Sequence, residues 1–300
     1  MVQGTLHNMG VVAIALFCYY ILPTFASRVS IYHQGQNNSG QLWTITNYDQ
    51  QYWSNDWRVS DVTIGYGPSA ATYKGSTYVF HNSASNNLRL SYLVAETGQD
   101  LLVPDTDISY SPSAVVYSDK LLVFHAGGND NDELWFNMFD GEDWAGDTVL
   151  GTATLSDGPG AVVFNGFLYV FHQLNNQLWY TFFDGISWLA DKQVPNTDAS
   201  ASPSGVVFNS KLYVFHHGGL SNKELWYNVF DGTNWEGDKR VLGSALQDGP
   251  TPVVNGNKII VYYQGIDNWL HYNIFDGIKW TGDVLAPNVG IGFKPAVVVT

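Results

Sequence analysis

One pattern recurs six times along the chain, and it limits the fold more than any other feature. Each copy carries an aromatic–His or aromatic–Tyr pair and a Gly- or Asn-rich stretch, and the clearest copies continue with LW and FDGxxW. The copies occupy residues 29–53, 76–100, 121–144, 168–188, 212–235 and 259–280. Their histidines follow one another at intervals of 44 to 48 residues, with Tyr263 at the sixth position. A fixed period of this size indicates a solenoid, a propeller or an array.

Each copy contains four strand-sized runs rich in Val, Tyr, Phe and Trp. In the fifth copy the runs read SPSGVVF, KLYVFHH, ELWYNVFD and NWEGDKRVL, with turns at Asn209-Ser210 and Asp231-Gly232. Asp-Gly favours tight hairpins, and no window has the apolar period of a helix. We therefore expect an all-β fold, a six-bladed β-propeller of four-stranded antiparallel blades. Two β-sandwiches are the alternative, although six equal units do not divide naturally into two.

The two ends of the repeat region complement each other. The first copy begins with a second strand at Val29, whereas residues 295–300 (PAVVVT) read as a first strand. We expect this C-terminal strand to pair with residues 29–35 and close the ring, because closure removes exposed sheet edges. Residues 27–300 would then form a single propeller domain.

The connecting segments alternate between two types. Copies one, three and five lead into Gly-Pro, whereas copies two, four and six carry Val-Pro or Ala-Pro before a longer polar linker. The Gly-Pro pairs are Gly67-Pro68, Gly158-Pro159 and Gly249-Pro250. This alternation indicates an ancestral pair of blades that was used three times.

The N-terminal 26 residues have the features of a secretory signal peptide. They contain no Asp, Glu, Lys or Arg, and the apolar run from Met9 to Leu22 precedes the small residues Thr24 and Ala26. An uncleaved anchor is the alternative, although this run is short for a membrane span. We expect a secreted, extracellular protein, with no membrane association after cleavage and an N-glycosylation site at Asn37.

The charge balance is acidic, with 27 Asp and Glu against 13 Lys and Arg and a formal net charge of -14. A nucleic-acid partner requires a basic surface, so we expect none. The only cysteine, Cys18, lies in the predicted signal peptide. The mature chain would therefore contain no disulfide.

The stretch NxxLWxxxFDGxxW resembles the repeats of β-propeller lectins, both the fungal six-bladed fucose-binding lectins and the bacterial seven-bladed group. The resemblance covers the whole mature chain and implies a sugar-binding propeller. In the fucose-binding lectins an Arg and a Glu grip the sugar. The matching positions here hold Tyr169 or Tyr213 for the Arg and Tyr180 or Tyr227 for the Glu, so the resemblance does not extend to that pair.

Recurring polar and aromatic residues are the candidates for carbohydrate binding. Tryptophan recurs at one position as Trp43, Trp135, Trp179 and Trp226, and histidine recurs as His33, His81, His125, His172 and His216. Nearby amides and carboxylates are Gln34, Gln173, Glu133 and Glu224. An aromatic wall beside planar polar groups suits neutral sugars. Packing between blades is nevertheless the main interpretation for the tryptophans, and a bond to a turn carbonyl is the main interpretation for each histidine.

A second tryptophan position holds Trp144, Trp188, Trp235 and Trp280, with Trp53 or Trp57 in the first copy. For this set too, packing between blades is the main interpretation and a sugar platform is the alternative.

Enzymatic and metal sites find little support in the sequence. The aspartates of the FDG turns recur in four copies, which favours turn chemistry over a unique pair of catalytic carboxylates; they are Asp140, Asp184, Asp231 and Asp276. Residues 129–133 (NDNDE) resemble a calcium loop in composition but lack its spacing. We expect no catalytic activity, no metal and no cofactor.

The sequence therefore predicts a multivalent, secreted lectin whose partners are glycans or glycoproteins. An extracellular propeller that binds proteins is the second hypothesis, and an enzyme of diverged activity is the third. The oligomeric state is not predicted.

Overall fold

The computed structural model describes residues 27–84, 88–128, 131–219 and 222–300. These residues form 24 strands and no helix. No helix within the same ranges is long and apolar enough to cross a membrane. The predicted signal peptide, residues 1–26, lies outside the described residues.

The strands group into six antiparallel blades. Blade 1 contains β1 (Arg28–Gln34), β2 (Gln41–Tyr48), β3 (Tyr52–Trp53), β4 (Trp57–Thr63) and β24 (Ala296–Val299). Blade 2 contains β5 (Ser69–Tyr73), β6 (Ser76–Ser83), β7 (Arg89–Val94) and the first part of β8 (Gln99–Tyr117). Blade 3 contains the rest of β8, β9 (Lys120–Gly127), β10 (Glu133–Phe139) and β11 (Thr148–Thr154).

The remaining three blades each form a separate four-stranded sheet. Blade 4 contains β12 (Gly160–Phe164), β13 (Phe167–Leu174), β14 (Gln177–Phe183) and β15 (Lys192–Gln193). Blade 5 contains β16 (Ala199–Phe208), β17 (Lys211–Gly218), β18 (Glu224–Phe230) and β19 (Lys239–Ala245). Blade 6 contains β20 (Thr251–Asn255), β21 (Lys258–Gln264), β22 (Trp269–Phe275) and β23 (Val284–Gly290).

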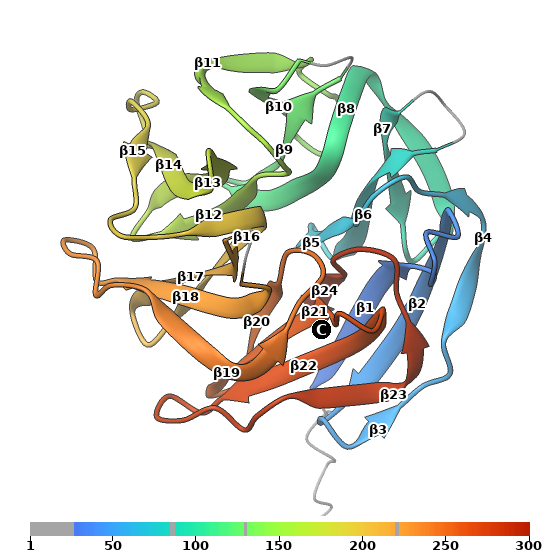
Figure 1. The fold of residues 1–300 in the computed structure, drawn as a ribbon. Coiled ribbons are helices and arrows are strands. Elements are labelled where there is room, and N and C mark those ends of the chain that lie inside the picture. Colours follow the sequence, from blue (N-terminus) through green and yellow to red (C-terminus); the bar gives the residue numbers. More distant parts are fainter. Residues whose placement is uncertain (1–26, 85–87, 129–130, 220–221) are drawn as a thin grey trace, which may run out of the picture.

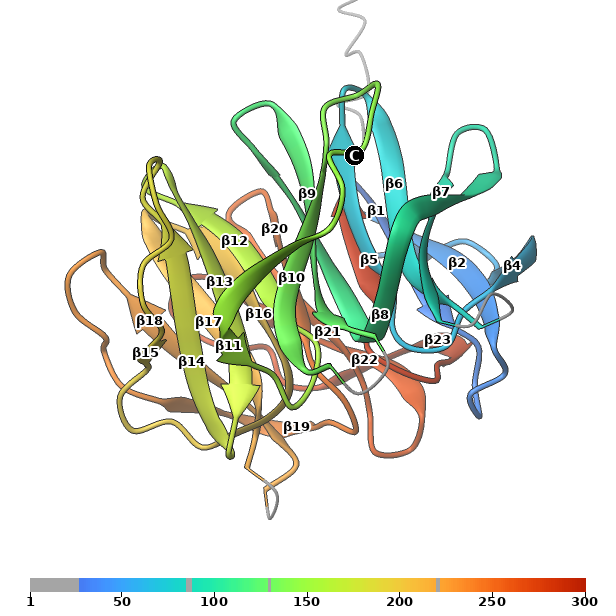
Figure 2. The same cartoon turned by 90° about the horizontal axis from the view of Figure 1, so that it is seen from above.

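The blades are arranged around a central axis (Figure 1), and the twisted sheets with their hairpin turns are visible from above in Figure 2. Residues of the six inner strands line a central channel with a cavity of about 190 Å³. The first strand of each blade lies innermost and contacts the first strands of neighbouring blades. Strand β8 is continuous and serves as both the outer strand of blade 2 and the inner strand of blade 3. The two blades therefore form one seven-stranded sheet. The predicted six-bladed, all-β architecture is therefore confirmed.

The C-terminal strand supplies the innermost strand of blade 1. Strand β24 pairs antiparallel with β1, from Val29 opposite Val299 to Tyr32 opposite Ala296. It also contacts the inner strands β20 and β5 of the two neighbouring blades. The first and last segments of the repeat region therefore share one sheet.

The predicted turns have the expected chemistry. Asn209 and Ser210 both have positive φ, 48° and 58°, as a two-residue hairpin turn with the twist of its strands requires. At the next turn, Asp231 Oδ1 accepts hydrogen bonds from the backbone N–H groups of Thr233 and Asn234. These bonds lower the pKa of Asp231. The other three FDG aspartates also accept two backbone N–H bonds each at their turns. Turn formation thus accounts for the recurrence of these aspartates.

The second tryptophan set packs between blades, as predicted. Trp235 lies 4.8 Å from the ring of Phe230 in its own blade and 5.8 Å from Tyr180 in blade 4. Trp144, Trp188 and Trp280 make the same kind of contact with the preceding blade. In blade 1 the member is Trp53, which contacts Tyr272, whereas Trp57 is exposed. Each of these rings therefore packs in the interface between its own blade and the preceding one.

Candidate functional site

The five recurring histidines are fully buried, at 0% exposure, and each pairs with an aspartate at the start of the outer strand. His216 Nε2 lies 2.9 Å from Asp238 Oδ1. The equivalent pairs are His33–Asp56, His81–Asp100, His125–Asp147 and His172–Asp191, at 2.8–3.0 Å. These imidazoles fix the outer strand to the second strand and offer no surface to a ligand. We therefore exclude direct sugar contacts by these histidines from the site.

The pairs differ between odd and even blades. In blades 1, 3 and 5 the histidine and its aspartate are 22 or 23 residues apart in the sequence, whereas in blades 2 and 4 they are 19 residues apart. In the odd blades the histidine Nδ1 also lies within hydrogen-bond distance of the carbonyl oxygen of the next residue. The outer connection is thus longer in odd blades. This difference follows the alternation of the linkers and supports a repeated blade pair.

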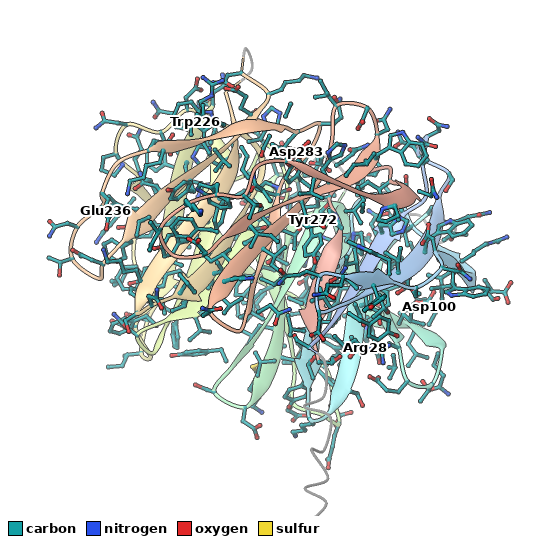
Figure 3. The ribbon with its side chains drawn as sticks, turned by 90° about the horizontal axis from the view of Figure 1, so that it is seen from below. Arg28, Asp100, Trp226, Glu236, Tyr272 and Asp283 are labelled. Carbon is teal, nitrogen blue, oxygen red and sulfur yellow. The ribbon has the colours of Figure 1, made fainter. Side chains whose placement is uncertain are left out.

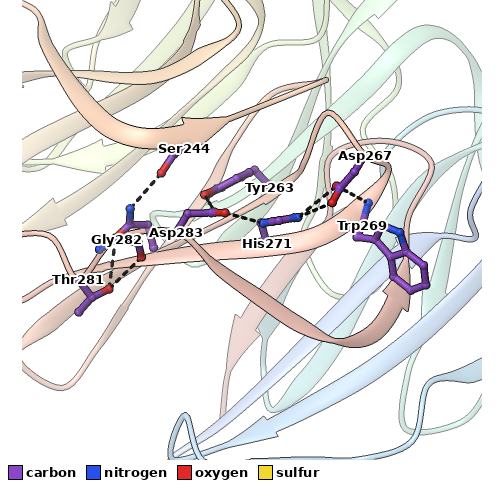
Figure 4. A network of polar contacts seen from close by, with 9 residues as sticks. Ser244, Tyr263, Asp267, Trp269, His271, Thr281, Gly282 and Asp283 are labelled. Carbon is purple, nitrogen blue, oxygen red and sulfur yellow. Dashed lines mark hydrogen bonds and ion pairs between the residues drawn. The ribbon is translucent and has the colours of Figure 1, made fainter.

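Blade 6 replaces the buried pair with an open polar network (Figure 4). The Tyr263 hydroxyl donates to Asp283, and His271 lies between Asp283 Oδ2 at 2.9 Å and Asp267 Oδ1 at 3.1 Å. Hydrogen bonding to Asp283 raises the pKa of His271. In the strand pairing, Trp226 lies opposite His216 and His271 lies opposite Tyr263. His271 therefore occupies the repeat position of Trp226.

The predicted amides and carboxylates have mixed surroundings. Gln34 is buried and donates from Nε2 to the carbonyl of Ile64 at 2.9 Å, and Gln173 is buried as well. We therefore exclude both glutamines from the ligand contacts. Glu133 is exposed, and Glu224 forms an ion pair with Arg240 across the outer strands. Only the two glutamates are accessible to a ligand.

The first tryptophan set is half-buried in all four blades. In blade 5, Trp226 borders a cavity of about 470 Å³ between the linker from blade 4 and the turn after β17. The cavity is lined by Asn196, Asp198, Gly218, Gly219, Asn222, Trp226 and Asp238. Figure 3 shows Trp226 and Asp283 toward the same rim of the molecule. The cavity thus combines one aromatic ring with two carboxylates and two amides.

Two glycines make this arrangement sterically possible. A Cβ at Gly218 would lie 3.0 Å from the indole ring of Trp226, and a Cβ at Gly219 would lie 2.0 Å from the carboxylate of Asp198. At such distances a larger residue would displace the ring or the carboxylate. Buried His216 holds Asp238 from below, so it positions a cavity residue without touching a ligand.

Blade 1 has a cavity that corresponds only in part to the blade 5 cavity, because it lies beside Trp53 and residues 51–56 and Trp43 does not line it. Its volume is 400 Å³, and its lining includes Asp56 and Asn288, which match Asp238 and Asn196 in the repeat. In both blades the tryptophan pairs across the sheet with an arginine, Trp43 with Arg58 and Trp226 with Arg240. Blades 1 and 5 therefore share the Trp–Arg pair, an outer-strand aspartate and a linker asparagine.

Blade 3 keeps the tryptophan and the linker positions but not the arginine, since Trp135 lies opposite Val149. Asp105 and Asp107 occupy the linker positions of Asn196 and Asp198, and Arg89 of blade 2 forms ion pairs with both. The turn residues 129–130 lie outside the described residues, as does part of the calcium-like segment 129–133. The full shape of this third site is therefore not described.

The positions that match the Arg and Glu of the fucose-binding lectins hold tyrosines that pack against other aromatic rings. Tyr213 and Tyr227 stack at 6.1 Å, and Trp280 from blade 6 lies 5.6 Å from Tyr227. Tyr169 and Tyr180 form the same arrangement with Trp235. These seams contain no Arg–Glu pair, in agreement with the sequence.

The outer-strand aspartates were missed as site residues by sequence reasoning. Their signal is the spacing WxxD, which recurs at 53–56, 144–147, 188–191, 235–238 and 280–283. Asp198 and Asn196 have a weaker signal, because only their place in the longer linkers distinguishes them. Within the described ranges, no group of three or more His, Cys, Asp or Glu residues could hold a metal ion.

Comparison with solved structures places the architecture among known propellers. The fucose-specific lectin from Aleuria aurantia superposes with a TM-score of 0.68 at 14% identity, covering 88% of this chain and 97% of that one. The chain therefore shares the six-bladed β-propeller fold of that lectin. AofleA from Arthrobotrys oligospora superposes with a TM-score of 0.60 at 14% identity, covering 92% and 89% of the two chains.

An enzyme shares part of the same architecture. An α-L-arabinofuranosidase from Clostridium thermocellum superposes with a TM-score of 0.53 at 15% identity, covering 77% of this chain and 97% of that chain. No protein-family model matches the sequence, and no curated protein matches it either. The comparisons thus support the predicted resemblance at the level of the fold.

Proposed function

We propose that the protein is a carbohydrate-binding protein, a lectin, whose best-defined ligand site is the blade 5 cavity, with related sites beside the tryptophans of blades 1 and 3. The observation that carries the proposal is the blade 5 cavity, where Trp226 lies beside Asp198, Asp238, Asn196 and Asn222. The indole face packs against the apolar face of a pyranose, and the carboxylates and amides accept or donate hydrogen bonds to its hydroxyls. The lectin neighbours support this proposal, since the Aleuria aurantia protein is fucose-specific.

The chemistry of the cavity favours neutral sugars. Asp198 and Asp238 repel carboxylated sugars, and the adjacent Arg240 is already paired with Glu224. A neutral sugar exchanges water for protein partners with little net gain. We therefore expect weak individual sites, with dissociation constants roughly in the millimolar to micromolar range, and avidity on surfaces that present many glycans.

Secretion belongs to the same proposal. The uncharged N-terminal segment supports export with cleavage near Ser27, and Asn37 is exposed in a turn where a glycan has room. N-terminal sequencing of secreted material and its mass before and after glycosidase treatment test both points. Retention of Met1 on a membrane-bound chain would contradict export as a free protein.

A glycan array with the purified chain 27–300 tests the lectin proposal. We expect binding to neutral glycans and none to sialylated glycans, and Trp226→Ala should weaken the signal. The absence of any binding would favour the protein-binding propeller instead.

One observation favours an enzyme as the second candidate, because two carboxylates share the cavity and an arabinofuranosidase has a related fold. Incubation with chromogenic glycosides separates the two functions. Release of the chromophore that is lost in both Asp198→Asn and Asp238→Asn would establish the enzyme.

A further inference from the structure

A further cavity of about 410 Å³ lies at the mouth of the central channel, separate from the cavities at blades 1 and 5. One wall is aromatic: Tyr66 lies 6.0 Å from Tyr110 at 59° and 5.4 Å from Phe293 at 57° between ring planes. These residues come from three different linkers between blades. Tyr110 has a φ of 59°, a left-handed conformation that is unfavourable for a bulky residue and is often found at functional sites.

The other wall carries two carboxylates at matching positions before Gly-Pro. Asp157 accepts hydrogen bonds from Gly158 N at 2.6 Å and Ser202 Oγ at 2.8 Å. Asp248 accepts bonds from Gly249 N at 2.6 Å and Lys294 N at 2.9 Å. Burial, with a smaller contribution from Asp248, raises the pKa of Asp157 to about 6. The carboxylate of Asp157 is therefore poorly solvated when it is ionised.

Lys294 is the one cationic side chain among the described residues that line the channel cavities. It occupies the position held by Ser111 and Ser202 in the other two blade pairs, is 4% exposed and lines a deeper cavity of 190 Å³. Its ammonium forms no ion pair within 4.0 Å with a described carboxylate. Counted by formal charge, one lysine stands against two aspartates in the channel, and burial lowers the pKa of Lys294, so the channel has an excess of acidic groups.

We propose that the channel mouth binds a small organic cation of the quaternary-ammonium or methylated-amine class. The cation lies against the faces of Tyr66, Tyr110 and Phe293, where the ring quadrupoles attract it. Asp157 and Asp248 balance its charge. A neutral glycan gains nothing from this excess charge, which distinguishes the channel mouth from the blade cavities.

Choline and 3,3-dimethylbutan-1-ol, its uncharged isostere, form the matched probe pair for isothermal titration of the chain 27–300 at pH 7.5 and low salt. We expect one choline per chain and at least about tenfold weaker binding of the alcohol. Equal affinity for the two molecules would overturn the proposal, as would the absence of choline binding up to about 10 mM.

Two variants and one control locate the site. Asp157→Asn keeps an acceptor oxygen for Gly158 and Ser202, so the variant should fold, and choline affinity should fall by about tenfold or more. Phe293→Ala should also weaken binding. Glu142→Ala removes one exposed negative charge elsewhere and should leave binding unchanged. Unchanged affinity in Asp157→Asn, with a native melting profile, would contradict the assignment.

The pH dependence gives a further readout. Choline affinity should rise between pH 5 and pH 7.5 in the wild type as Asp157 loses its proton, and this rise should shrink in Asp157→Asn. The other titratable groups around the mouth are Asp248, Lys294, Tyr66, Tyr110 and His217. A neutral glycan that binds the blade cavities should not compete with choline. Competition would overturn the separate site, whereas the absence of any glycan binding would affect only the lectin proposal.

Discussion

The buried His–Asp pairs show how single residues determine the sites of this propeller. His216 lies at 0% exposure beneath Asp238, which in turn lines the blade 5 cavity. The imidazole therefore acts on the cavity through the carboxylate. Its loss should affect both folding and the orientation of Asp238.

His216→Ala should reduce the free energy of unfolding by about 2–4 kcal/mol, because it leaves a cavity and removes the partner of a partly buried carboxylate. Urea unfolding followed by tryptophan fluorescence measures the change. Glu133→Ala, at an exposed position, is the control and should change stability by less than about 0.5 kcal/mol. Equal stability of the two variants would show that the histidine pair is not structural.

His271 should make a stability contribution that depends on pH. Its pKa is raised in the folded protein, chiefly by Asp283, so its stabilisation is fully present below the unfolded pKa of about 6.5. That stabilisation is lost as the pH rises through the higher folded value. His271→Ala should therefore cost about 1–2 kcal/mol at pH 6 and less at pH 9, measured by urea unfolding at each pH. A larger cost at pH 9 would contradict the assignment.

At the scale of elements, β24 is the strand on which the first blade depends. Its inner residues Ala296, Val297 and Val298 are buried, whereas Val299 is 38% exposed. The strand joins the last residues of the chain to β1. Without it, β1 would present an unpaired edge to solvent.

Val298→Asp should destabilise the protein by about 3 kcal/mol or more, because it places an unpaired charge in a buried strand. The neighbouring change Val299→Asp should cost less than about 1 kcal/mol. Thermal melting and light scattering of the two variants measure stability and aggregation. If both variants behaved as the wild type, β24 would not be needed to complete the ring.

Local patterns account for much of what could be predicted from the sequence. Turn residues such as Asn209-Ser210 and Asp231-Gly232 act within a few residues, and the FDG signal recurs in four copies of the repeat. The burial of His216 and Gln34 could not be predicted in this way, because their partners lie 22 and 30 residues further on. The blade 5 cavity was equally hidden, since Asp198 precedes β16 and Trp226 lies on β18, and the two meet only when the strands of blade 5 pair.

At the scale of the whole molecule, the odd blades carry the candidate sites and the even blades separate them. Cavities occur at blades 1 and 5, and blade 3 carries acidic residues, Asp105 and Asp107, at the linker positions of Asn196 and Asp198. The turns after the second strands line both kinds of cavity, Asn222 in blade 5 and Asn38 and Asn268 at the channel mouth. Glycan sites on one face of the ring would favour binding to a surface with many copies of the ligand.

Titration of the chain 27–300 with its best glycan from the array tests the central claim most directly. The wild type should bind at up to three sites per chain, and Asp198→Ala, which removes an exposed cavity carboxylate, should lower the site number by about one without changing the melting temperature. Glu142→Ala is the control of equal charge. An unchanged site number in Asp198→Ala, or a wild type that binds no glycan, would contradict carbohydrate binding in the blade cavities.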